Sequence, residues 1–418
     1  MNDLTVIITL VIIVNFVFNY ILDALNAKKF KTPLPGLIQD VYDGERYEQS
    51  VAYKVVNHRF DKIEALVGLL IILVFLWLGG FGWADQMARM VSENELVVAL
   101  VFFGILGLGS DLLGIPFSYY HTFVIEERFG FNKQTKKLFW TDKLKSWLLA
   151  GILGSVLLFV VIKLYGIAGE SFWWYAWLVI TAFTVFMNLF YAQIFVPLFN
   201  KQTPLSKGAL RDKIEAYAAK VNFSLQNIYV IDGSKRSTKA NAYFSGFGKQ
   251  KRITLYDTLI ESLSPDEIVA VLAHEVGHYK KKHILWQMLV SILTMGVTLY
   301  ILSLSLRFSL FSEALGIPVH SFHAGLVSFS LLYSPISMVL GVFGNLLSRK
   351  FEYQADAFAA ETYRGEHLIG ALKKLSSDAL NNVTPHTAYV FVHYSHPPLL
   401  ARILHLHKVH QTDNHLVD

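Results

Sequence analysis

The chain has 418 residues, of which 53% are hydrophobic and only 17% are charged, and its formal net charge is +5. A globular protein of this length needs fewer apolar residues, so the composition favours a membrane protein over a soluble one. The sequence contains no cysteine, which excludes disulfides, thiolate nucleophiles and cysteine-ligated metals. Any bound metal must therefore be held by His, Asp or Glu.

Stretches of about 20 mainly apolar residues recur along the chain, and each is long enough to cross roughly 30 Å of hydrocarbon. The predicted spans are residues 4–22, 63–81, 96–117, 147–165, 172–198, 284–306 and 324–347. We therefore expect about seven transmembrane helices. The first stretch lacks a basic leader and a small-residue cleavage site, so we interpret it as a retained helix and not as a signal peptide.

Lysine and arginine are abundant after the first and third predicted spans and nearly absent after the second, fourth and sixth. Because cationic loops stay on the cytoplasmic side of a membrane, this alternation predicts that the N-terminus lies outside. Residues 200–283 and the C-terminal tail are then cytoplasmic. The topology and anionic lipid headgroups explain the positive charge, so the expected partner is the lipid bilayer and not a nucleic acid.

The composition changes after the fifth span, and we expect a domain boundary there. Residues 1–198 are predicted to form a membrane domain of five spans with cytoplasmic loops. Residues 199–418 are predicted to form a second domain that includes the last two spans. Within it, residues 208–221 have the pattern of an amphipathic helix and residues 227–231 that of a short strand.

A hairpin is predicted from two further strand-like runs, residues 239–247 and 251–256, which a basic, glycine-containing turn joins. Asn241, Ala242 and Tyr243 lie on its first strand. We expect this strand to form an exposed sheet edge, where an extended substrate can bind by backbone pairing.

The start of the next helix is marked by three residues. Ser264 provides an N-cap hydroxyl, Pro265 occupies the first helical position, and Glu267 stands three residues after the cap. Apolar residues recur at helical spacing after them, so the pattern predicts a helix that continues through Tyr279 and packs against the domain core or the membrane.

On that predicted helix lie His274, Glu275 and His278. The spacing of four puts both imidazoles on one helical face, where they can bind a single Zn²⁺, with Glu275 placed beside them toward the metal-bound water. The small Gly277 allows another backbone to approach closely. A chance match is the alternative, since the chain contains 15 histidines.

The best candidate for the third metal ligand is Glu352, on a helix that continues from the seventh span. Asp356 follows one turn later on the same face, with Ala355 between them, so it is expected to hold the far nitrogen of a ligating histidine. The alternative is that Glu352 pairs with Arg349 on a solvated face.

Near the C-terminus, His396 is restrained by the prolines that follow it. If it reaches the metal site, it can stabilise a developing oxyanion. A structural role for His396 explains the pattern equally well. The remaining histidines considered for the site, His283, His393 and His405, are expected at the surface.

Taken together, several motifs resemble the integral-membrane CAAX prenyl protease family of zinc peptidases, of the a-factor converting enzyme type. The resemblance covers nearly the whole chain. Its motifs are residues 126–132, residues 234–237 leading into 241–244, residues 257–259, residues 274–278, Glu352 with Asp356, and residues 395–397.

The resemblance implies a mainly α-helical membrane protein in which about seven helices enclose a water-filled chamber. A cytoplasmic α+β domain, a gluzincin-like zinc metallopeptidase, caps that chamber. Carried over from the family, the resemblance implies one Zn²⁺ per chain, held by His274, His278 and Glu352. It also implies that Glu275 is the base. Substrate or transition-state contacts would come from Asn241, His396 and Arg402.

In the family, the reaction is removal of the last three residues after a prenylated cysteine. The expected partner is therefore a peptide or protein substrate, in some cases prenylated. The alternative is membrane-protein quality control, as in the shorter bacterial stress peptidase HtpX. The host decides whether the membrane is the endoplasmic reticulum or the bacterial inner membrane.

Two non-peptidase alternatives are weighed against this interpretation. Polar residues within the spans, such as Asp111, fit a transporter or channel. A scaffold stabilised by zinc would need a closed tetrahedral site with His396 or Asp356 as the fourth ligand.

Overall fold

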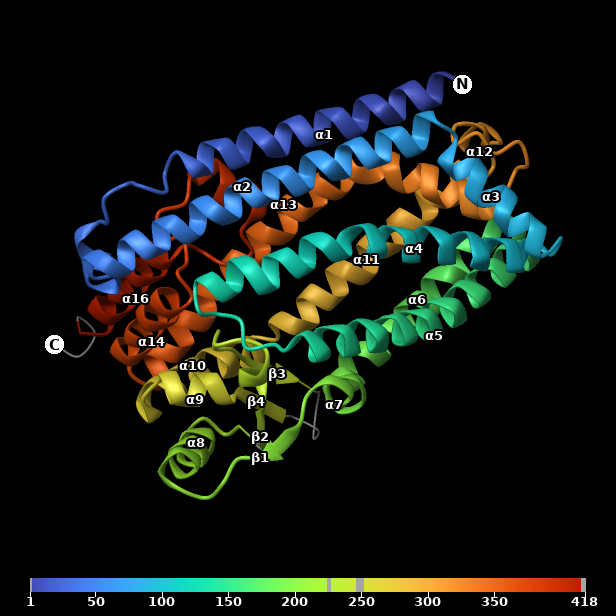
Figure 1. Cartoon of the computed structure of the whole chain (residues 1–418). Helices are drawn as coiled ribbons and strands as arrows, with labels where there is room; N and C mark the ends of the chain where they lie inside the picture. Colours follow the sequence, from blue (N-terminus) through green and yellow to red (C-terminus); the bar gives the residue numbers. More distant parts are fainter. Residues whose placement is uncertain (1, 224–226, 246–251, 415–418) are drawn as a thin grey trace.

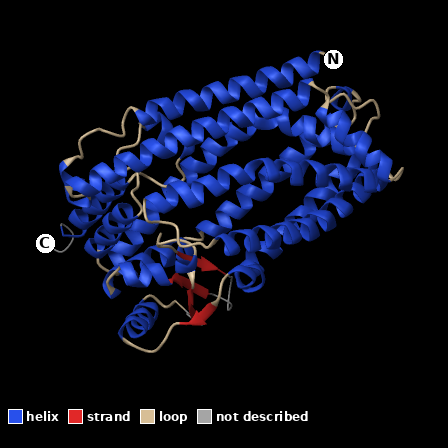
Figure 2. Ribbon diagram, in the orientation of Figure 1, coloured by secondary structure: helices blue, strands red, loops and turns tan. Residues whose placement is uncertain are grey.

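The computed structural model describes residues 2–223, 227–245 and 252–414 (Figure 1). Long helices run beside one another along the molecule, and the strands gather at one end, as Figure 2 shows. The N-terminus lies at the opposite end. The protein is therefore built as a helical bundle that carries a small mixed domain on one side of the membrane region.

Six helices in the described ranges are long and apolar enough to cross a membrane. They are α1 (Asp3–Ala27), α4 (Glu95–Tyr120), α5 (Lys136–Ala168), α6 (Phe172–Phe190), α11 (His283–Ser305) and α13 (Phe322–Thr362). The consecutive helices α2 (Gly44–Trp77) and α3 (Gly80–Val91) pass the same test together, which raises the number to seven. This agrees with the expectation of about seven spans.

The predicted span at residues 63–81 is bent and not straight. Helices α2 and α3 meet at 64°. Gly79 has a φ of +74°, a left-handed conformation that ends α2, and Gly80 packs so closely that a Cβ there would lie 2.4 Å from the ring of Phe75. The sequence pattern missed this bend because apolar residues continue through it.

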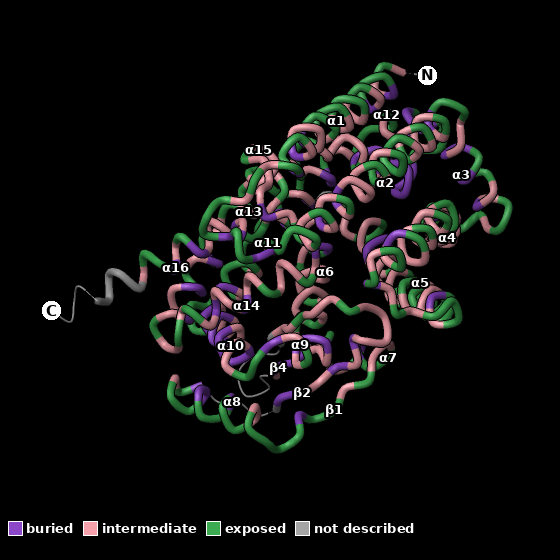
Figure 3. Tube along the Cα trace, turned by 60° about the vertical axis from the view of Figure 1, so that its left-hand side comes forward, coloured by how far each residue is buried: buried purple, intermediate pink, exposed green. Residues whose placement is uncertain are grey.

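Many residues along the long helices are exposed (Figure 3), and a large share of them are apolar. Val14, Ile152 and Phe343 are each more than 60% exposed. Such a continuous apolar exterior is unfavourable in water and matches lipid tails. The chain is a multi-pass membrane protein.

The mixed domain contains a four-stranded sheet in the order β1-β2-β4-β3. The strands are β1 (Gln202–Pro204), β2 (Asn227–Ile231), β3 (Ala242–Ser245) and β4 (Arg252–Tyr256). Strands β2 and β4 are parallel, whereas β3 and β4 are antiparallel with β3 at the edge. The predicted strands are confirmed, and the turn of the hairpin, residues 246–251, lies outside the described residues.

Helices cover this sheet and form the core of the domain. Helix α8 (Ala209–Lys220) confirms the predicted amphipathic helix. It packs against α10 (Pro265–Lys280), which also contacts α9 (Asp257–Ser262) and α14 (Gly365–Asp378). The most buried members of this core include Ile214, Leu255, Leu259, Ile268 and Val269, with Leu406 from the C-terminal helix α16 (Leu399–Asn414).

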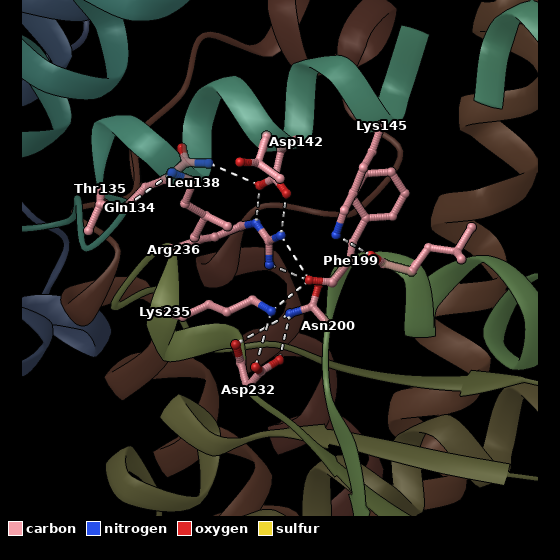
Figure 4. A network of polar contacts seen from close by, with 12 residues as sticks. Gln134, Thr135, Leu138, Asp142, Lys145, Phe199, Asn200, Asp232, Lys235 and Arg236 are labelled. Carbon is pink, nitrogen blue, oxygen red and sulfur yellow. Dashed lines mark hydrogen bonds and ion pairs between the residues drawn. The ribbon is translucent and has the colours of Figure 1, made fainter. Parts of the chain in front are cut away.

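A polar network fastens the mixed domain to the membrane helices (Figure 4). Arg236, in the loop between β2 and β3, donates to both carboxylate oxygens of Asp142 on α5, at 2.8 and 2.9 Å. It also donates to the carbonyl of Phe199 and the side chain of Asn200. Asn200 in turn contacts Asp232. This network fixes the loop that leads into the edge strand.

A second contact holds the start of the edge strand. Lys239 forms an ion pair with Glu126 at 2.8 Å, and the hydroxyl of Tyr53 donates to the same carboxylate at 2.5 Å. The Lys239 ammonium also lies 4.4 Å from the ring centre of Phe131. Residues from α2, from the segment after α4 and from the sheet therefore meet here.

Candidate active site

Helix α10 presents two histidines to one side. It begins with the predicted capping box, in which Ser264 and Glu267 each bond to the other's backbone, and this fixes its register. The Nε2 atoms of His274 and His278 lie 3.1 Å apart. For two nitrogens bound to one tetrahedral zinc at about 2.05 Å, the expected separation is about 3.3 Å. The pair thus already has a spacing suited to a shared ion.

Glu352 reaches these histidines from α13. Its carboxylate oxygens lie 3.2 Å from His278 Nε2 and 3.5 Å from His274 Nε2. Helix α13 has 41 residues, about 61 Å in length, which is twice the thickness of the hydrocarbon core. Its C-terminal part therefore leaves the membrane region and carries Glu352 to α10.

His274, His278 and Glu352 are a group able to hold a metal ion, with one ligand atom of each lying within 4.8 Å of the others. Oε2 of Glu352 is buried and has no hydrogen-bond partner in the described part of the chain. Its nearest cationic neighbours, His274 Nε2 at 3.5 Å and Arg402 Nη1 at 3.7 Å, do not form a hydrogen bond with it, and a buried carboxylate oxygen without a hydrogen bond is costly. A cation bound between the three side chains would satisfy it, so the residues present fit a metal.

Asp356 and Arg402 stand behind His274. The His274 Nδ1 atom lies 2.8 Å from Asp356 Oδ1. Arg402 donates to both oxygens of Asp356, at 2.9 and 2.5 Å. Because a carboxylate only accepts, His274 Nδ1 carries a proton and Nε2 is the nitrogen that faces the shared site.

Burial lowers the pKa of His274, but the carboxylates of Asp356 and Glu352 beside the ring outweigh it and raise the pKa to about 9. In the metal-free protein this ring therefore holds a second proton near neutral pH. A metal would have to displace that proton.

His283 is part of the site, although the sequence suggested a surface position. It is only 1% exposed. Its ring stacks on Phe351 at 4.2 Å, its Nε2 lies 2.8 Å from Gln354 Oε1, and its Nδ1 lies 3.0 Å from His278 Nδ1. The prediction was wrong because Lys282 adopts a left-handed φ of 60° and turns the chain back.

The contacts of His283 set the tautomer of His278. Gln354 Oε1 can only accept, so His283 Nε2 carries the proton and His283 Nδ1 accepts. His278 must then donate from Nδ1, which leaves its Nε2 unprotonated, as a metal ligand requires. Of the other two histidines expected at the surface, His393 is exposed and His405 is half-buried with Nε2 3.1 Å from the Tyr353 carbonyl.

The structure does not pair Glu352 with Arg349, which was the alternative to metal binding. Arg349 points to the main chain of the C-terminal segment, donating to the carbonyls of Val390 and Tyr394. Glu352 is therefore not held in a surface ion pair with Arg349.

A cavity of about 420 Å³ lies over the three metal-binding side chains. Glu275 and His396 line it, and His396 Nε2 is 3.4 Å from Glu352 Oε1. Arg402 also lines the cavity, but its Nε and Nη2 donate to Asp356 and its Nη1 lies 3.7 Å from Glu352 Oε2, so its contact with substrate stays a prediction. An apolar wall completes the cavity, formed by Leu259, Val271, Leu368, Leu372 and Leu375.

The edge strand borders the same cavity through Asn241 and Ala242. The Asn241 side chain accepts from its neighbour's amide, that of Ala242, at 2.8 Å. The ring of Tyr243 packs with Ala192, Val196 and Ile231 beneath the sheet edge. The structure thus brings residues 241 and 242 to the site, whereas substrate contact by Tyr243 stays a prediction.

Comparisons with known proteins agree in their results. Residues 23–201 match the profile described as CAAX prenyl protease N-terminal, five membrane helices, and residues 204–410 match that of peptidase family M48. The chain is 37% identical to a CAAX prenyl protease 1 homolog of Oryza sativa, with 94% of each chain covered. It is 34% identical to CAAX prenyl protease 1 of Saccharomyces cerevisiae, with 90% of this chain and 89% of the relative covered.

The human CAAX prenyl protease 1 homolog is 33% identical over 90% of this chain and 89% of its own length. Among solved structures, that of S. mikatae Ste24p superimposes with a TM-score of 0.92 at 34% identity. That match covers 97% of this chain and 99% of the other.

Proposed function

The chain belongs to peptidase family M48 and carries the membrane domain of the CAAX prenyl proteases, and from this membership we propose that it cuts peptides with one zinc ion held by His274, His278 and Glu352. It is a membrane metallopeptidase. The observation that carries the zinc assignment is the convergence of the Nε2 atoms of two histidines with a buried carboxylate oxygen that accepts no hydrogen bond in the described part of the chain. Ligands of these types are the ones that zinc prefers in peptidases.

In the proposed mechanism, zinc supplies Lewis-acid chemistry that activates water and polarises the scissile carbonyl. Glu275, between the two histidines and open to the cavity, takes a proton from the water and later gives it to the leaving amine. His396 donates to the oxygen on which negative charge develops. Asp356 and His283 keep the two histidines in the tautomers that ligation requires.

The cavity suggests how substrate binds. The outer edge of β3 can pair with an extended peptide, and Asn241 stands at its start. The apolar wall of α9, α10 and α14 is suited to an aliphatic side chain next to the scissile bond. Together with the names of the relatives, this supports a substrate that ends in a prenylated cysteine followed by three residues.

An open catalytic site is supported over a closed, purely structural one. Both oxygens of Asp356 are already occupied by His274 and Arg402, so Asp356 is not available as a fourth ligand. The side chain of His396 is 64% exposed, as suits a group that meets substrate. A non-catalytic scaffold stabilised by zinc would instead need Asp356 or His396 as the fourth zinc ligand.

Two further proposals concern placement. We place the active site on the cytoplasmic side and the N-terminus outside, supported by the charge of the loops and by the N-terminus lying at the end away from the sheet (Figure 1). We also divide the chain into residues 1–198 and 199–418. The two profile matches, which meet between residues 201 and 204, support this division.

The test uses the full-length, zinc-loaded protein in nanodiscs with two peptides that share one sequence, a cysteine followed by three aliphatic-rich residues. One peptide carries a farnesyl group on the cysteine and the other does not. We expect release of the last three residues, with a strong preference for the lipidated peptide. Equal cleavage of both would support general quality control instead, and no cleavage of either would overturn the peptidase proposal for this class of substrate.

A further inference from the structure

The C-terminal segment that carries His396 is held by α13 through its carbonyl groups. The short helix α15 (Thr387–His393) ends two residues before Ser395 and three before His396. The last carbonyls of a helix have no partners within the helix. Here they point at two side chains of α13.

Arg349 and Asn345 occupy these carbonyls. Arg349 donates to the carbonyls of Val390 at 3.0 Å and Phe391 at 3.4 Å, and also to that of Tyr394. Asn345 donates from Nδ2 to the carbonyl of Val392 at 2.7 Å. Four carbonyls within the six residues before His396 are therefore bound by two side chains one turn apart. Bonds from a guanidinium are charge-assisted and geometrically specific.

Asn345 and Arg349 lie on the same face of α13 as Glu352 and Asp356. Positions 345, 349, 352 and 356 are separated by four, three and four residues, which places all of them within about 60° of one another around the helix. One stripe of α13 thus holds the α15 segment, supplies Glu352 and supports His274 through Asp356. The segment before His396 and the metal ligand Glu352 are therefore both anchored on α13.

His396 needs such support because packing does not hold it. Its side chain is 64% exposed, and its polar contacts are to Ser395 at 3.0 Å and Glu352 at 3.4 Å. On the other side of it, the backbone is restrained by Pro397 and Pro398, whose carbonyl caps the start of α16 through the Arg402 amide at 3.1 Å. The backbone is therefore fixed on both sides of an exposed imidazole.

We propose that Arg349, assisted by Asn345, is a positioning residue of the active site, which fixes the segment before His396 so that this imidazole reaches the reacting carbonyl. The inference rests on the proposed function, since it assigns Arg349 an effect only through His396. Arg349 itself does not touch the metal-binding side chains in this arrangement.

The test is a double-mutant cycle with Arg349→Met, His396→Ala and the combined variant, measured on the full-length, zinc-loaded protein with the farnesylated peptide. We expect each single variant to lower kcat by about 10- to 100-fold with KM changed by less than about threefold. The combined variant should lose little more than either one. Arg349→Lys, which keeps a cationic donor, should recover part of the loss.

Arg46→Met is the matched control. Arg46 also donates to carbonyls at a helix end, those of Ser377 and Asp378 at the end of α14, at 3.4 and 3.1 Å. The effect of Arg46→Met on kcat should simply multiply with that of His396→Ala, so that the cycle shows no coupling between the two residues. Should Arg349→Met fail to fold, Asn345→Ala replaces it in the cycle, with an expected loss of about threefold to tenfold that is likewise absent in the His396→Ala background.

The outcomes separate the two proposals. Independent, multiplying effects of Arg349→Met and His396→Ala overturn the positioning role, as does full activity of both Arg349→Met and Asn345→Ala. If His396→Ala keeps full kcat, the catalytic role of His396 fails and the positioning role fails with it, while the zinc site and Glu275 are unaffected by that result.

Discussion

Gly277 of α10 lies directly against Ala355 of α13. A Cβ added at Gly277 would be 3.0 Å from Ala355 Cα and 3.1 Å from its carbonyl oxygen. This close crossing brings His274 and His278 within reach of Glu352, which stands one turn before Asp356 on the facing helix. The separation of two backbones thus determines whether the three metal-binding side chains meet.

Gly277→Ala is expected to push the two helices apart by a few tenths of an ångström. Overpacking of this kind costs about 1–3 kcal/mol, and the displaced Glu352 should weaken zinc binding by about tenfold. Zinc affinity by chelator competition and thermal unfolding in detergent measure both effects. Gly344→Ala is the matched control, since a Cβ there meets nothing within 4 Å, and a similar loss in that variant would contradict the explanation.

His283→Ala should lower zinc affinity about 10- to 100-fold, because His278 loses the partner that fixes its tautomer. His283→Phe separates this effect from packing, since the phenyl ring keeps the stacking on Phe351 but accepts no hydrogen bond. Both variants should bind zinc more weakly than the unmodified protein. If His283→Phe binds zinc normally, the ring matters only as packing.

Zinc affinity should depend on pH because His274 must lose a proton to bind the ion. Its pKa is raised to about 9 by Asp356 and Glu352 against the effect of burial, so the ring is protonated below that pH in the metal-free protein. The affinity should therefore fall by about tenfold for each pH unit below 9. Competition with a chelator of known protonation between pH 7 and 9 measures this slope.

In Asp356→Asn the dependence between pH 7 and 9 should flatten, because the hydrogen bond that contributes to the raised His274 pKa is weakened. A flat profile in the unmodified protein would show that the ring is already neutral at pH 7. That result would contradict the assignment of the His274 contacts.

Asp142→Asn should loosen the attachment of the mixed domain to α5. The Arg236–Asp142 pair is mostly shielded from solvent, with side chains 24% and 17% exposed, and losing a charge-assisted bond of this kind costs about 1–3 kcal/mol. Unfolding temperature in detergent should fall by a few degrees. Glu215→Gln removes an exposed pair with Arg211 and should change stability by less than about 0.5 kcal/mol.

Local pattern was sufficient for the elements that carry the metal site. The capping box of Ser264 and Glu267 set the start of α10, the i and i+4 spacing placed two imidazoles together, and continuity of the last span placed Glu352 and Asp356 on one face. Apart from the continuity of the span, each of these inferences needed only residues within two helical turns of one another. The structure has the same arrangement.

Contacts between distant segments could not be predicted in this way. The burial of His283 depends on a left-handed residue and on Gln354, 71 positions away. The direction of Arg349 depends on carbonyls about 41 to 45 positions away. Residue types alone offered Arg349 only a carboxylate partner, Glu352, as the alternative to metal binding, because a main-chain carbonyl leaves no signal in the sequence.

The most direct measurement is the zinc content of two purified variants, Glu352→Gln and Glu275→Gln, together with their turnover of the farnesylated peptide. The proposed site predicts that Glu275→Gln keeps one zinc per chain but loses nearly all turnover, whereas Glu352→Gln loses both. Full zinc retention in Glu352→Gln, or normal turnover in Glu275→Gln, would contradict it.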